Sequence, residues 1–110
     1  MTDKIKLVQG DTRPALICTL TDETTNAPIS IVGATVVLKF REVGSETLKA
    51  TIPGSITNGA LGQVAFYWAS VPTSLDGDPG DYEGEIEITF SDGQIQTVYD
   101  PLKFKLRQDF

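Results

Sequence analysis

Residues 80–90, with the sequence GDYEGEIEITF, alternate between apolar and polar side chains. Because side chains along a β-strand point to opposite faces in turn, the alternation predicts a strand with one face in a core and acids on the other. The predicted core residues are Tyr82, Ile86, Ile88 and Phe90. A turn-rich segment precedes this strand, and Asp92-Gly93 after it is typical of a hairpin. The stretch therefore predicts a central strand of a small antiparallel sandwich.

The rest of the chain shows the same period in shorter runs. Strands are predicted at residues 5–8, 15–21, 34–42, 48–52, 62–68 and 94–106. We expect the run at 48–52 to end at Pro53-Gly54, and the last run to bulge or change sheets at Asp100-Pro101. One helical turn is expected near Ser74. The pattern predicts an all-β, antiparallel sandwich of about seven to eight strands that fills residues 1–110 as one domain.

The start of residues 80–90 carries a pattern known from immunoglobulin-like domains. Asp78-x-Gly80-x-Tyr82 is similar to the tyrosine corner of those domains. Gly84 stands where an antibody domain has its second cysteine, and Trp68 is expected on a later strand than the antibody tryptophan. Phe66 and Trp68 alternate with polar neighbours and are predicted core anchors. We therefore expect an immunoglobulin-like sandwich without a disulfide.

Composition removes several classes of function. The net charge is −6 at pH 7, which opposes nucleic-acid binding because phosphate contacts need clustered Lys and Arg. No apolar run is long enough to span a membrane, and the first residues lack the apolar core of a secretory signal peptide. The chain has one cysteine, Cys18, and no histidine. We expect Cys18 to be a buried small hydrophobe, and we expect no catalytic residue, metal site or cofactor.

Two groups of acids have structural explanations. Glu83, Glu85 and Glu87 are expected between strands that carry Lys39 with Arg41 and Lys103 with Lys105, so cross-strand ion pairs are predicted. The alternative is an acidic docking stripe. Three aspartates lie close together around the turn-rich segment: Asp76, Asp78 and Asp81. We expect them to form turns, and a calcium site is the alternative.

One predicted face is uncharged and partly apolar. Gln63, Ala65 and Tyr67 are expected to point away from the core, beside Ile17 and Thr19, if the two strands share a sheet. An uncharged patch with a central aromatic residue is typical of protein interfaces. We predict that this face, together with the terminal Phe110, contacts another protein; the alternative is an ordinary, lightly polar surface.

The order of several segments resembles a known family. These segments are 7–14 (LVQGDTRP), 20–22 (LTD), 28–36, 39–41 (KFR), 62–68 (GQVAFYW) and 80–93 (GDYEGEIEITFSDG). Together they resemble the immunoglobulin-like amino-terminal domain of phage baseplate upper proteins, over nearly the whole chain.

The resemblance implies a structural role in a phage virion. The expected protein is not an enzyme; it is made in the host cytoplasm and contacts other virion proteins in many copies, in the baseplate or tail, at the neck or on the capsid surface. A carbohydrate-binding or host-adhesion module is the alternative. Such a module would present several exposed aromatic residues, for which Tyr67, Tyr82 and Tyr99 are the candidates.

Overall fold

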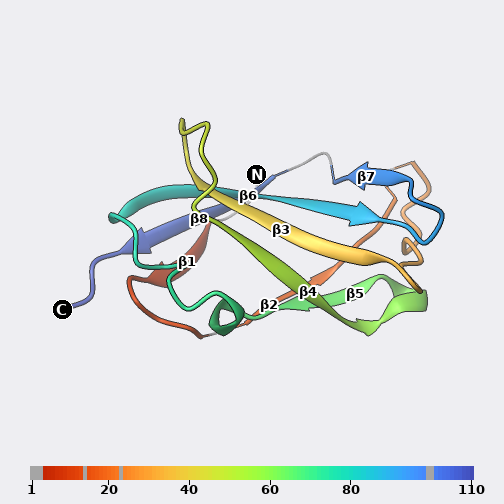
Figure 1. Ribbon diagram of the computed structural model, residues 1–110, viewed down its shortest axis with the longest axis horizontal. Coiled ribbons are helices and arrows are strands. Elements are labelled where there is room, and N and C mark those ends of the chain that lie inside the picture. Colours follow the sequence, from red (N-terminus) through yellow and green to blue (C-terminus); the bar gives the residue numbers. More distant parts are fainter. Residues whose placement is uncertain (1–3, 14, 23, 99–100) are drawn as a thin grey trace.

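The computed structural model describes residues 4–13, 15–22, 24–98 and 101–110, and in these residues the regular secondary structure is almost entirely β-strand (Figure 1). The strands are β1 (Ile5–Val8), β2 (Leu16–Thr19), β3 (Thr35–Glu42), β4 (Ala50–Asn58), β5 (Gln63–Phe66), β6 (Gly80–Thr89), β7 (Ile95–Thr97) and β8 (Leu102–Arg107). Two 3₁₀ turns, η1 (Gly59–Leu61) and η2 (Trp68–Ser70), flank β5. The predicted all-β class is confirmed, and Cys18 is free.

The strands form two layers that share one strand (Figure 1). The larger sheet has the order β1-β8-β6-β3-β4, with β7 also paired to β6, and the smaller sheet has the order β4-β5-β2. The first half of β4 pairs with β3, and its second half pairs with β5. All pairs are antiparallel except β1 with β8, which is parallel. The predicted sandwich is confirmed, but the larger sheet is mixed because the first strand lies parallel to the last.

The shared strand β4 corrects the prediction that residues 48–52 end at Pro53-Gly54. The strand continues through both residues, and its partner changes there from Val37, opposite Pro53, to Phe66, opposite Gly54. A Cβ atom on Gly54 would lie 2.8 Å from the carbonyl oxygen of Val36 and 2.8 Å from a methyl group of Val64. Glycine is therefore needed because backbone and side chains approach closely where the strand passes between sheets.

The core lies between the two layers and centres on aromatic side chains. The ring of Phe40 lies 5.0 Å from Tyr82 and 5.2 Å from both Trp68 and Phe104, measured between centroids. Val36 and Leu38 of β3, Ile86 and Ile88 of β6, and Phe66 of β5 are also buried. Phe90 is only partly buried, because it follows the last residue of β6 at the edge of the core. Trp68 is buried, but it begins η2 and does not lie on a strand.

The two ends of β6 have the predicted turn chemistry. The Tyr82 hydroxyl donates to the Asp78 carbonyl oxygen at 2.7 Å, which is the hydrogen bond of a tyrosine corner. At the other end, Gly93 has φ of 89°, and the Phe90 N–H donates to the Gln94 carbonyl oxygen, so β6 and β7 form the predicted hairpin.

The connections around residues 74 and 100 differ from the predictions. A hydrogen-bonded turn, with the Ser74 N–H donating to the Val71 carbonyl, stands where a helical turn was expected. Both β7 and β8 pair with β6, so the chain stays in one sheet and the predicted change of sheet is wrong. Asp100, where the bulge or bend was expected to begin, lies outside the described residues.

Candidate protein interface

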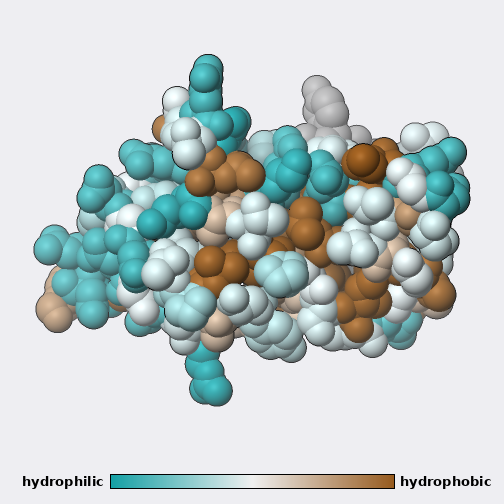
Figure 2. Space-filling model, viewed as in Figure 1, coloured by the Kyte–Doolittle hydropathy of each residue, from teal (hydrophilic) through white to brown (hydrophobic). Residues whose placement is uncertain are grey.

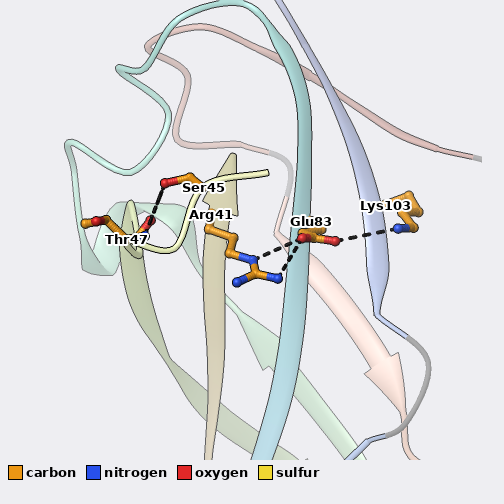
Figure 3. A network of polar contacts seen from close by, with 5 residues as sticks. All are labelled: Arg41, Ser45, Thr47, Glu83 and Lys103. Atoms are coloured by element: carbon orange, nitrogen blue, oxygen red, sulfur yellow. Dashed lines mark hydrogen bonds and ion pairs between the residues drawn. The ribbon is translucent and has the colours of Figure 1, made fainter. Parts of the chain in front are cut away.

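The outer face of the larger sheet is a field of ion pairs across neighbouring strands. Glu83 of β6 contacts Arg41 of β3 at 2.9 Å and Lys103 of β8 at 3.6 Å (Figure 3). Lys39 contacts Glu87 at 2.8 Å, a diagonal pair, because its direct opposite is Glu85. The predicted cross-strand ion pairs are confirmed, although none of the ion pairs found between described side chains includes Glu85.

Ion pairing extends to the parallel edge of this sheet and shifts two pKa values. Asp81 contacts Lys4 at 2.8 Å and Lys105 at 3.7 Å. The hydrogen bond from Lys4 and the charge of Lys105 hold the pKa of the Asp81 carboxyl below its ordinary value. The hydrogen bond and charge of Glu87 raise the pKa of Lys39. Most of the positive and negative side chains on this face therefore form ion pairs with one another within the chain.

The outer face of the smaller sheet is built from β2 and β5, which carry no charged residue. The two strands pair antiparallel, with Ile17 opposite Ala65 and Thr19 opposite Gln63, so these four residues share one face. Ile17 is 74% exposed and Tyr67, just after β5, is 47% exposed. Thr19 is also exposed, and Gln63 is partly buried. The structure thus brings Ile17, Thr19, Gln63 and Tyr67 together, and we call these four residues the uncharged patch.

Ala65 and Phe110 do not belong to this exposed patch. Ala65 is 1% exposed, and its partners on the two flanking strands are Ile17 of β2 and Ser55 of β4. Ala65 is therefore buried beneath the uncharged patch and offers no area to a partner. Phe110 is fully exposed and follows β8 of the larger sheet, where the Arg107 guanidinium lies 4.7 Å from its ring centre. The C-terminus lies at the opposite end of the long axis from β5 (Figure 1).

The sequence pattern missed a set of exposed apolar residues beside the smaller sheet. Val32 is 68% exposed, Leu61 of η1 is 48% exposed and Ile56 of β4 is 36% exposed. The Ile31 N–H donates to the Gly59 carbonyl at 2.9 Å, which holds Val32 against the β4–β5 connection. Figure 2 shows hydrophobic side chains over the region where β4 and β5 lie, whereas the opposite end is mostly hydrophilic. None of the three residues lies in an alternating run, so periodicity gave no signal.

The other candidate sites have simpler structural roles. Among the described residues, no group of three acids or cysteines is placed to hold a metal ion, and Asp81 is committed to two lysines. Cys18 is half-buried, and burial raises the pKa of its thiol, which lowers the fraction of reactive thiolate. Of the tyrosines considered for sugar binding, Tyr82 is buried against Phe40, and Tyr99 lies outside the described residues. No helix in the described ranges is long and apolar enough to cross a membrane.

The architecture defines an all-β sandwich protein, and comparisons with known proteins refine that class. No family and no curated protein matches the sequence. Among solved structures, the chain is similar to the N-terminal domain of phage TP901-1 ORF48, with a TM-score of 0.64 and 10% identity over 98% of this chain and 86% of that chain. It is also similar to CopC from Methylosinus trichosporium OB3b, with a TM-score of 0.52 and 8% identity over 97% of this chain and 86% of that chain. At such identities the likeness establishes the fold alone.

Proposed function

We propose that this chain is a non-enzymatic structural protein of a phage virion that acts through protein–protein contacts. The observation that carries the proposal is the shared fold with the N-terminal domain of phage TP901-1 ORF48 over 98% of the chain. The order of sequence segments that resembles phage baseplate upper proteins is in line with it. Baseplate, tail, neck and capsid surface are all compatible positions.

The working surface in this proposal is the uncharged patch of the smaller sheet. Its side chains lack the ion pairs that cover the larger sheet, so a partner would remove apolar area from water without separating charges from their counter-ions. Tyr67 is the natural anchor, because an exposed aromatic side chain supplies large contact area at little conformational cost. Repeated copies in a particle would add avidity to contacts that are individually weak.

The test is incorporation of a charged variant into particles. Tyr67→Glu is expected to reduce incorporation at least about tenfold, because a carboxylate would be desolvated at the centre of the contact. Its unfolding free energy should stay within about 0.5 kcal/mol of wild type, since the position is exposed. Incorporation is measured by quantitative immunoblotting of purified particles.

The matched control is Ile95→Glu. Ile95 is 63% exposed on β7 of the larger sheet, so this variant gains the same charge on another surface and should be incorporated normally. Normal incorporation of Tyr67→Glu would reject the patch as the contact surface. Absence of the wild-type chain from purified particles would reject the virion role itself.

A further inference from the structure

Strand β2 forms a free edge of the smaller sheet. It is the last strand in the order, and among the described strands only β5 pairs with it. The Leu20 N–H donates to the Gly62 carbonyl in continuation of this pairing, so the even-numbered residues direct their backbone groups toward β5. The N–H and C=O groups of Ile17 and Thr19 therefore face away from the sheet, where an added strand could bond to them.

This edge lacks two of the features that usually prevent strand pairing, a charged side chain and a proline. The strand LICT contains no charge and no proline, and Ile17 at its centre is the most exposed apolar residue of any strand. Of the other edge strands, β1 carries a charge at Lys6, and β7 is one residue shorter than β2. An uncharged edge in a chain of net charge −6 is compatible with close approach of an identical edge.

An apolar groove opens beside the same edge. It has a volume of about 440 Å³ and is lined by residues 18–21, which include Thr19 and Thr21 besides Cys18 and Leu20, and by three apolar residues, Ile86, Val98 and Leu102. Cys18 and Leu20 lie on the inward face of β2, opposite in direction to Ile17. A strand added to β2 would direct alternate side chains over this groove.

We propose that β2 pairs antiparallel with β2 of a second copy of this chain, forming one continuous sheet through both molecules. Pleat matching and the outward backbone groups limit the register to pairings of odd with odd residues, and of these the pairing centred on Cys18 gives all four residues of each strand a partner, with Leu20 continuing the strand. Ile17 lies opposite Thr19 of the second copy, with hydrogen bonds in both directions, and the twofold axis passes between the two Cys18 residues. Leu16 of the second copy then lies opposite Leu20, over the groove. The two uncharged patches become one surface twice as wide.

The dimer concerns the strand edge and stands independently of the virion role. Light scattering coupled to size-exclusion chromatography is expected to show the mass rising from the 11.9 kDa of one chain toward twice that value as concentration increases. Ile17→Lys should raise the dissociation constant at least about tenfold, because lysine at a strand edge opposes pairing. Ile95→Lys, on the edge of β7, is the matched control and should leave dimerisation unchanged, as should Tyr67→Glu. A monomer at every concentration, or equal loss in both lysine variants, overturns the proposal.

Cys18 reports the register directly. Residues directly opposite in a non-hydrogen-bonded pair have Cα atoms about 4.5 Å apart, within the range of a disulfide. Oxidation by added copper–phenanthroline, which accepts two electrons as two thiols lose two protons, should therefore cross-link the wild-type dimer. Ile95→Cys in a Cys18→Ser background should not cross-link. If Ile17→Cys in that background cross-links and wild type does not, the proposed register is overturned.

Discussion

The outer faces of the two sheets are built by the same alternation but end in opposite chemical states. On the larger sheet, the outward residues of β3, β6 and β8 include acids and bases that form ion pairs of 3.7 Å or less. On the smaller sheet, the outward residues of β2 and β5 are uncharged, and Ile17 is left 74% exposed. The first face pairs most of its charges within the chain, whereas the second has exposed apolar area and a strand edge that, among the described strands, pairs on one side alone.

The difference teaches where a contact would be least costly. Covering the larger sheet would desolvate at least four ion pairs, and the Coulomb attraction seldom repays that desolvation. Covering the smaller sheet removes apolar surface and pairs a free strand edge. A protein that works by contact is therefore expected to use the smaller sheet, and ion pairs then act as a surface that resists non-specific association.

The largest effect is expected at Gly54 of β4, where this strand passes from one sheet to the other and the two outer faces meet. Gly54→Val is expected to lower the free energy of unfolding by about 1–3 kcal/mol, because its side chain would overlap Val36 and Val64. Both sheets of the variant should unfold in one transition, since β4 belongs to both sheets. Urea unfolding measures the change. Ser55→Val, at the next and exposed position, is the control and should shift stability by no more than about 0.5 kcal/mol; an equal loss there would show that packing at Gly54 is not the cause.

A smaller effect is expected from the ion pairs of the larger sheet, which set its outer face apart from that of the smaller sheet. Glu83→Gln is expected to cost about 0.5–1 kcal/mol, because the Glu83 carboxylate bridges Arg41 and Lys103. About 1 M salt should reduce the loss, since screening weakens the pairs that the variant removes. Glu85→Gln is the matched control on the same strand and should cost less, because Glu85 is exposed and outside the ion pairs found. Equal costs in both variants would mean that general charge, not pairing, matters.

Much of the larger sheet could be predicted from sequence because the alternation of buried and exposed residues is visible within each strand. In β3 and β6 one face is buried and the other wet over eight and ten residues, so the period of two is visible without knowing the partner. The ion pairs could also be predicted, because the acids of β6 lie between bases on the two neighbouring strands, β3 and β8. The Asp78–Tyr82 corner was also predictable, since its hydrogen bond spans only four residues.

The smaller sheet and the candidate interface were harder to predict because their environment is set by residues distant in sequence. The continuation of β4 through Pro53-Gly54 depends on β5 replacing β3 as its partner. The burial of Ala65 depends on neighbours from β2 and β4. Val32 lies beside the β4–β5 connection, where the neighbouring Ile31 bonds to Gly59, a residue distant in sequence. A local pattern contains none of these contacts, so it identified the face but not which of its residues reach solvent.

The smallest expected effect is a pH dependence that the ion pairs of the larger sheet produce. Asp81 has a lowered pKa, so its pairing with Lys4 stabilises the fold above the unfolded value of about 3.9 and is lost as the pH falls through the lower folded value. Lys39 has a raised pKa, so its pairing with Glu87 is fully present below about 10.4 and is lost as the pH rises through the higher folded value. Burial also raises the pKa of Tyr82, which adds a second loss at alkaline pH.

Differences between variants separate these titrations. In urea unfolding, the stability difference between wild type and Asp81→Asn should be constant near neutral pH and shrink below about pH 4. The difference between wild type and Lys39→Gln should shrink above about pH 10, and the Tyr82 contribution cancels because both proteins retain it. Thr19→Ala, on the smaller sheet, should show no pH dependence of its difference, since no ionisable group lies on β2 or β5 beyond the half-buried Cys18. A difference for Asp81→Asn that persists unchanged at pH 2 would show that its contribution is not ionic, and the contrast between the two faces would then rest on packing and not on charge.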